Sequence, residues 1–208
     1  LDLERVHHIV EHACRGLAGV SESAVEMNSG LQFFDGIKTS DIQEILIRSA
    51  NDLITLDAPN YQYVAARLLL FSLRKAVYQG HPDERPKLLD HVKKCVDLNV
   101  YDGSILTKFS DEEWDKLNSY IDHDRDYLFT YAGIRQVVDK YLVQDRSNSE
   151  LYETPQYMYM LIAATIFQNY SIETRLDYVR RYYNAISKHR INIPTPVMAG
   201  VRTPIRQF

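Results

Sequence analysis

Two short stretches of the sequence carry residue types that bind metals. His8, Glu11 and His12 lie in HIVEH, which matches the H-x-x-E-H pattern of inverted zinc peptidases. A zinc site also needs a third protein ligand and an open position for water, so an exposed helix face is the favoured interpretation. IDHDRD (121–126) gathers three aspartates and a histidine, but acidic residues are common at helix N-termini, which favours a helix cap. We therefore expect no metal in this chain.

A second group of residues could bind a nucleotide. Phe71 and Lys75 are four positions apart, so on a helix an aromatic face lies beside an ammonium, which suits a base and a phosphate. A core phenylalanine with a lysine stem covering apolar surface is the commoner arrangement. Thr39 and Ser40 open a predicted helix, whose free N–H groups favour anions, although no glycine-rich phosphate loop accompanies them. From these residues alone the nucleotide interpretation stays open.

Composition limits the function classes. The 208 residues are 45% hydrophobic and 25% charged with a net charge of −4, which is ordinary for a globular protein and excludes a globally basic nucleic-acid binder. Residues 171–208 hold seven Arg or Lys against two acidic residues, which is typical of a solvated helix face but also suits phosphate. The longest apolar run, 158–167, is about half of a membrane span. Cys14 and Cys95 form no disulfide framework, so we expect a reducing cytoplasm and neither membrane nor nucleic acid as partner.

Helix signals position these residues. Asp2 is a predicted cap and Gly16 a predicted stop for the first helix, and Asp57 with Pro59 is expected to start a helix over 57–80. Ser40-x-x-Gln43 and Ser110-x-x-Glu113 have the spacing of capping boxes. Further helices are expected at 21–29, 86–98, 111–121, 126–141, 154–170 and 171–187.

The remaining segments separate or close these helices. QGHPDERP (79–86) is polar with Gly and two prolines, which is typical of a linker. Residues 140–153 alternate apolar and polar residues around a polar turn and predict a short hairpin, whereas 158–167 is apolar on all sides and predicts a buried helix. The closing stretch 191–208 keeps β-compatible residues between its prolines, which allows either a flexible tail or a strand.

Long strings in the sequence resemble one enzyme family. QFFDGIKTSDIQEILIRSANDLI and DAPNYQYVAARLLLFSLRK resemble the ATP cone of the large subunit of class I ribonucleotide reductase. IDHDRDYLFTYAGIRQVVDKYLVQDR, ELYETPQYMYMLIAATIF, ETRLDYVRRYYNAIS and IPTPVMAGVRTPIRQF continue the resemblance in the same order. The resemblance implies a mainly α fold, in which a four-helix ATP-cone remnant precedes a helical domain with a short β-hairpin. The chain would end in the first strand of a missing α/β barrel.

The resemblance also implies the site residues. Within the ATP cone, ATP as activator and dATP as inhibitor would bind residues at the start of the first helix, on the helix opened by Thr39 and on the helix of Phe71. These residues are Asp2, Leu3, Glu4, Arg5, Thr39, Ile42, Phe71 and Lys75. Basic residues of the family's N-terminal strands would precede Leu1, and Asp2 and Gln43 stand where close relatives have Asn and His, which should weaken binding. Thr195 would contact the substrate diphosphate, and no catalytic residue falls within the chain.

The implied domains are an ATP cone over 1–78, a linker at 79–86, a helical N-terminal domain over 87–190 and the start of the catalytic barrel at 191–208. The whole enzyme would reduce ribonucleoside diphosphates by radical chemistry. Its partners would be a metallo-radical small subunit, a second large subunit and thioredoxin or glutaredoxin. The 208 residues alone are expected to be inactive. The alternative is a non-catalytic helical module that binds a nucleotide or another protein.

Overall fold

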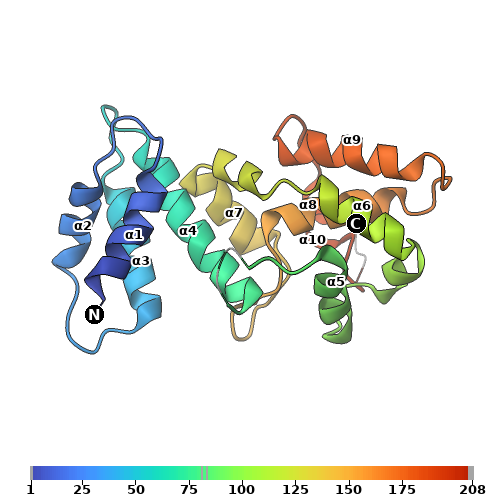
Figure 1. Ribbon diagram of the computed structural model, residues 1–208, viewed down its shortest axis with the longest axis horizontal. Helices are drawn as coiled ribbons and strands as arrows, with labels where there is room; N and C mark the ends of the chain where they lie inside the picture. Colours follow the sequence, from blue (N-terminus) through green and yellow to red (C-terminus); the bar gives the residue numbers. More distant parts are fainter. Residues whose placement is uncertain (1, 81, 83, 206–208) are drawn as a thin grey trace. The chain divides into compact units, whose positions relative to one another are not determined.

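The structure, a computed structural model, describes residues 2–80, 82 and 84–205. Its α-helices are α1 (Leu3–Cys14), α2 (Glu22–Gly30), α3 (Thr39–Asp52), α4 (Tyr61–Tyr78), α5 (Leu88–Asp97), α6 (Asp111–Tyr120), α7 (Tyr131–Lys140), α8 (Pro155–Phe167), α9 (Arg175–Ser187) and α10 (Thr195–Gly200). Two short 3₁₀ helices, η1 (Gly103–Thr107) and η2 (His123–Leu128), lie among them. The predicted mainly helical fold is confirmed (Figure 1). Among the described residues, no helix is long and apolar enough to cross a membrane.

The chain forms two compact units. The first holds the chain up to Leu73 together with Phe129–Gln136, and the second holds Arg74–Leu128 and the chain from Val137 onward. The division therefore falls inside α4 and inside α7, so each of these helices contributes to both units. The predicted domain limits at 78, 86 and 190 stay predictions. Leu1, His81, Asp83 and 206–208, which those domains include, lie outside the described residues.

In the first unit, α1 to α4 alternate in direction (Figure 1). α2 packs against both α1 and α3. Each helix turns an apolar stripe inward, because its apolar residues recur at helical spacing. Val10 of α1, Val25 of α2, Leu46 of α3 and Val64 of α4 are completely buried. The predicted helices of this part are thus confirmed as elements.

Helix starts were predicted with mixed success. Asp2 is the N-cap of α1 and accepts the Arg5 N–H at 3.1 Å, and Ser110 and Glu113 form the predicted capping box of α6. The Ser40–Gln43 box is wrong, because α3 begins at Thr39 with Lys38 as N-cap, two residues earlier than predicted, and the Gln43 side chain is buried. Asp57 is also wrong as a cap, because α4 begins at Tyr61.

Replacing Ser110 with alanine should lower the free energy of unfolding by about 1 kcal/mol, because the Glu113 N–H loses its acceptor. Ser40→Ala is the matched control, since the Ser40 hydroxyl only donates to Asp41 on the surface. Its cost should stay within about 0.5 kcal/mol. Urea unfolding measures both, and equal effects of the two substitutions would contradict the observed helix starts.

The second unit is built around α8. Its residues from Pro155 to Ala164 are all buried, as predicted for an apolar helix covered on every side, and α9 packs along it. The predicted hairpin is confirmed as two short antiparallel strands, β1 (Gln144–Asp145) and β2 (Glu150–Leu151). These strands bring Glu153 directly to the start of α8.

The strand predicted within 191–208 is wrong for the described part of this segment. Residues 195–200 form α10 instead, with Pro194 as N-cap and Pro196 in the first turn. Proline has no N–H to give to a sheet, whereas its fixed φ suits the first turn of a helix. Among the described residues the only sheet is the hairpin, so this segment pairs with no strand.

Candidate functional site

The candidate nucleotide-binding residues of the first unit come from three helices, α1, α3 and α4. α1 and α3 both begin at the lower end of this unit in Figure 1, whereas α4 runs diagonally down and away from their starts. Asp2 to Arg5 lie at the start of α1, and Thr39 and Ile42 at the start of α3. Phe71 lies late in α4, and Lys75 follows it by one turn on the same helix. The topology therefore brings the predicted residues of α1 and α3 to one end of the first unit.

The start of α3 is suited to an anion. Lys38, its N-cap, gives no side-chain hydrogen bond to the first N–H groups of the helix. Those N–H groups and the helix dipole supply positive potential, and the Lys38 side chain adds a charge. Thr39 is exposed at this point, so its hydroxyl is accessible. The first turn of α3 also carries Asp41, as that of α1 carries Glu4. The start of α1 differs in being occupied by the Asp2 cap, and Arg5 is exposed there.

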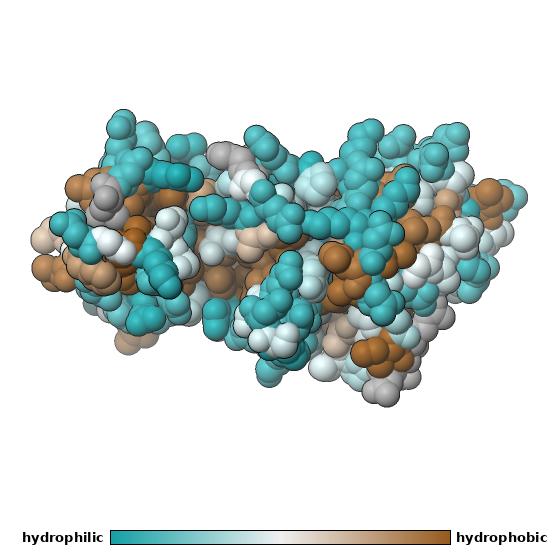
Figure 2. Space-filling view, turned by 90° about the horizontal axis from the view of Figure 1, so that it is seen from below, coloured by the Kyte–Doolittle hydropathy of each residue, from teal (hydrophilic) through white to brown (hydrophobic). Residues whose placement is uncertain are grey.

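The same end also offers apolar surface. Ile42 and Phe71 are half-buried, whereas Leu3 and Phe34 are each 65% exposed. Lys75, which is also half-buried, belongs to the second unit. Figure 2, which is seen from below, shows hydrophobic residues in the middle and at the left edge of this end of the first unit, with hydrophilic residues above and below them. An apolar centre with a polar border can hold a base with its phosphates.

Gln43 was predicted as a capping residue but is buried in this region. Its side chain is only 7% exposed, and its Oε1 has no hydrogen-bond partner among the described residues. A buried acceptor without a donor costs free energy, so Gln43 is placed where an added donor would be favourable. The only sequence signal for a role of Gln43 at this site is that it directly follows Ile42.

The two metal-like stretches have other roles. His8 and His12 are exposed on α1, and His8 lies 3.6 Å from the Glu11 carboxylate. In IDHDRD, the Asp122 carboxylate accepts the Asp124 N–H at the start of η2, as a cap does, while Asp126 turns inward. Within the described residues no group of three or more potential ligands is arranged for a metal ion.

The second unit contains two buried ion pairs that were not predicted from the sequence. Arg74 donates to the Asp126 carboxylate at 3.0 Å, and Gln156 donates to the other oxygen of Asp126 at 2.8 Å. Glu153 and Arg202 form the other pair, with side chains 0% and 1% exposed. Each pair joins residues about fifty positions apart, so sequence spacing gave no signal of either.

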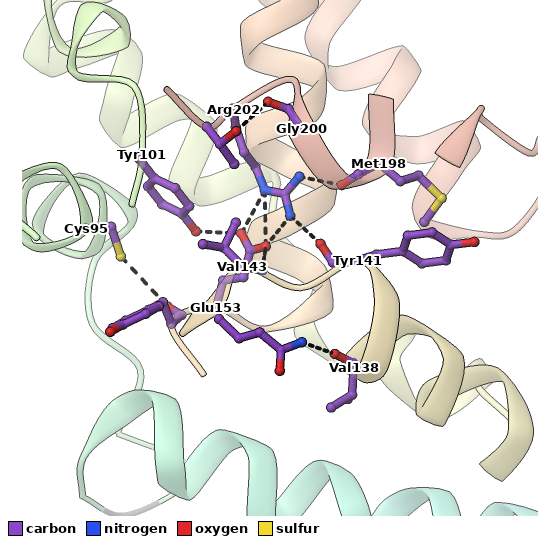
Figure 3. A network of polar contacts seen from close by, with 12 residues as sticks. Cys95, Tyr101, Val138, Tyr141, Val143, Glu153, Met198, Gly200 and Arg202 are labelled. Carbon is purple, nitrogen blue, oxygen red and sulfur yellow. Dashed lines mark hydrogen bonds and ion pairs between the residues drawn. The ribbon is translucent and has the colours of Figure 1, made fainter. Parts of the chain in front are cut away.

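The Glu153 carboxylate is the centre of a polar network (Figure 3). It accepts the Tyr101 hydroxyl at 2.6 Å and the Val143 N–H at 2.7 Å, besides the Arg202 guanidinium. Arg202 donates in addition to the Tyr141 and Met198 carbonyls. Burial alone lowers the pKa of Arg202, but the Glu153 carboxylate outweighs it and raises the pKa above its ordinary value. Arg202 therefore keeps its charge inside the protein.

The groups beside this network are not reactive. Burial raises the pKa of the Cys95 thiol to about 12, and the Glu153 charge adds to this rise. Burial lowers the pKa of His91 to about 4, so this histidine is neutral near pH 7. A neutral thiol is a poor nucleophile, so the contact between Cys95 and His91 at 3.7 Å is not a catalytic pair.

Thr195, the predicted substrate contact, is exposed in the first turn of α10. Its hydroxyl lies 3.5 Å from the Tyr141 hydroxyl. Tyr141 and Pro196 also line a cavity of about 530 Å³ in the second unit. Thr195 therefore lies beside a cavity large enough for a small ligand.

The sequence matches two domain families in this order. Residues 1–76 match the family described as the ATP cone domain, and residues 127–206 match the family described as the ribonucleotide reductase all-alpha domain. The whole chain is also 51% identical to the ribonucleoside-diphosphate reductase subunit alpha of Haemophilus influenzae. Over its whole length the chain is therefore similar to the N-terminal part of reductase alpha subunits, with an ATP cone domain followed by the all-alpha domain.

Other relatives carry the same name. Over all 208 residues the chain is 50% identical to the ribonucleoside-diphosphate reductase 1 subunit alpha of Escherichia coli strain K12. Over 192 residues, 91% of the chain, it is 44% identical to the ribonucleoside-diphosphate reductase subunit alpha of Enterobacteria phage T4. The chain spans 27% of the length of the first two of these relatives and 25% of the phage protein. Most of the residues that match the ATP cone domain, up to Leu73, lie in the first unit.

Proposed function

We propose that this chain is the N-terminal regulatory and scaffolding part of a ribonucleoside-diphosphate reductase of class I. The whole enzyme would reduce ribonucleoside diphosphates to deoxyribonucleoside diphosphates for DNA synthesis by radical chemistry. The observation that carries the proposal is an identity of about half over all 208 residues with reductase alpha subunits, together with the order of the two domains.

The allosteric site is proposed at the end of the first unit where α1 and α3 begin. Its residues would be Asp2, Leu3, Glu4, Arg5, Thr39, Ile42, Phe71 and Lys75. Ile42 and Phe71 would contact the base, while Thr39, the start of α3 and the basic side chains would contact phosphate. ATP would activate and dATP would inhibit. The uncapped start of α3 and the half-buried Phe71 support this placement.

Lys75→Ala should weaken ATP binding about tenfold or more, because it removes a charge-assisted hydrogen bond to phosphate. The reason for choosing Lys75 is its position one turn after Phe71 on α4. Lys93→Ala, an exposed lysine of α5, is the matched control and should leave the affinity unchanged. Titration calorimetry with ATP and dATP measures both, and equal affinities of the Lys75 and Lys93 variants would remove Lys75 from the site.

The remaining roles follow from the same proposal. Residues 1–78 would be the ATP cone, 79–86 a linker, 87–190 the helical domain and 191–208 the beginning of the catalytic barrel. Thr195 would contact the substrate diphosphate through its hydroxyl. The enzyme would work in the cytoplasm with a metallo-radical small subunit, as a dimer of large subunits, and with thioredoxin or glutaredoxin as reductant.

The proposal is tested by assaying reduction of ribonucleoside diphosphates. A complete large subunit containing these 208 residues should form product when the small subunit, a dithiol reductant and ATP are supplied. The 208 residues alone should form none, because no catalytic residue is assigned to them. Product formation by the isolated chain would overturn this division of roles. A complete subunit that binds ATP but never reduces the substrate would favour a non-catalytic nucleotide-binding module instead.

A further inference from the structure

The buried pair of Glu153 and Arg202 needs a reason other than stability. Both side chains are almost completely buried, and moving two charges out of water costs free energy that their attraction often only repays. A buried pair of this kind is therefore weak evidence for stabilisation. Its contacts show what it holds in place.

The pair connects two separate segments of the second unit (Figure 3). On the hairpin side, Glu153 accepts the Val143 N–H at 2.7 Å and Arg202 donates to the Tyr141 carbonyl at 2.9 Å. On the other side, Arg202 donates to the Met198 carbonyl inside α10. One guanidinium thus bonds the segment before β1 and the helix α10 at the same time.

These two segments are the main walls of the 530 Å³ cavity. One wall consists of residues from 140–146 and the other of residues from 196–205, with Asn99 and Val100 completing the lining. Thr195 directly precedes the second wall, and its hydroxyl lies 3.5 Å from that of Tyr141 in the first. The ion pair therefore fixes the spacing of the walls beside Thr195.

α10 depends on such external contacts. It has only six residues, its N-cap gives no side-chain hydrogen bond, and none of its residues is buried. A helix this short does not hold its conformation in water, because too few hydrogen bonds offset the cost of nucleation. Three features anchor it: the Arg202 bond to the Met198 carbonyl, the bond from the Asp102 N–H to the Arg202 carbonyl at 2.9 Å, and the burial of Val201 directly after the helix.

We propose that Arg202 and Glu153 act as positioning residues, which hold α10 and the Tyr141 segment so that the Thr195 hydroxyl is placed for substrate. This inference rests on the proposed function, in which Thr195 contacts the substrate diphosphate. Arg202 is too deeply buried to touch substrate itself, at 3% exposure. Its effect passes through the carbonyl of Met198 and the position of α10.

The test uses the double variant Arg202→Met with Glu153→Gln. It removes both buried charges together, and Gln keeps an acceptor oxygen for Val143 or Tyr101, so the unit should still fold. Hydrogen exchange of the 208-residue chain should then show amides of 197–201 exchanging about tenfold or more faster, while those of α8 stay unchanged. Unchanged exchange in α10 would overturn the proposal.

The second readout is kinetic and uses the complete large subunit. The KM for the nucleoside diphosphate should rise about 10- to 100-fold with little change in kcat, because misplacing a binding hydroxyl weakens ground state and transition state alike. Arg190→Met, an exposed arginine, is the control and should change neither constant. Faster exchange in α10 with an unchanged KM would overturn the positioning role. If the unaltered subunit reduces no substrate, the proposed function fails, and the exchange of α10 still decides whether the pair holds this helix.

Discussion

Replacing Asp126 with alanine should destabilise the second unit by about 3–5 kcal/mol, because the Arg74 guanidinium would stay buried without its carboxylate. Asp126 is completely buried and accepts hydrogen bonds from Arg74 at 3.0 Å and from Gln156 at 2.8 Å. Gln156 in turn accepts the Tyr183 hydroxyl at 2.6 Å. One carboxylate therefore connects η2 with α8 and, through Gln156, with α9.

Trp114, the only tryptophan of the chain, is buried in the second unit and reports its unfolding by fluorescence. Urea titration of the Asp126→Ala variant should show an earlier midpoint of that signal. Asp124→Ala is the matched control, because the Asp124 side chain is 74% exposed and lies 3.9 Å from Arg85. Its effect should stay within about 0.5 kcal/mol. Similar losses of unfolding free energy in the two variants would show that the buried contacts of Asp126 do not stabilise this unit.

Lowering the pH from 7 to 5 should also weaken the second unit strongly. Burial lowers the pKa of His91 to about 4, with Lys94 acting in the same direction and Glu153 against it. Burial lowers the pKa of His123 to about 3, assisted by Arg85 and Arg74. In the unfolded chain a histidine takes up its proton near pH 6.5. The unfolded state therefore gains protons first, and the stabilisation present above pH 6.5 is lost as the pH falls toward 4.

Each histidine should lower the free energy of unfolding by about 1.4 kcal/mol per pH unit below pH 6.5. The two together should therefore lower it by about 4 kcal/mol at pH 5. Urea titrations followed by Trp114 fluorescence at several pH values measure this slope. His91→Phe keeps a ring against Tyr157, which lies 4.5 Å from the His91 ring between centroids, and should remove about half of the slope. An unaltered slope in this variant would assign the pH dependence to other groups.

The features that sequence predicted well are local. The Asp2 cap and the Ser110–Glu113 box depend on residues three positions apart, so their signal lies within one turn of helix. The hairpin over 140–153 was equally local, because a polar turn separates its two strands. Local hydrogen bonds of this kind form whatever the rest of the chain does, which is why a pattern alone predicts them.

The features that sequence missed depend on partners far along the chain. Asp126 stood in a run of polar residues, yet Arg74 and Gln156 make its burial possible. Residues 195–200 were compatible with a strand, but the Arg202 contacts and the prolines favour α10. For the candidate nucleotide site, the residue types could be predicted from the sequence. The fold shows that those at the starts of α1 and α3 lie at the same end of the first unit. The starts of α1 and α3 could not be placed together without the alternating helix directions (Figure 1).

The proposed nucleotide site is tested most directly by hydrogen exchange of the 208-residue chain with and without ATP. At an ATP concentration 100 times the dissociation constant, amides in the first turns of α1 and α3 and around Phe71 in α4 should exchange more slowly, by up to about 100-fold. The amides of α8 should not change. Slower exchange confined to the second unit, or no change anywhere at millimolar ATP, would contradict a nucleotide site where α1 and α3 begin.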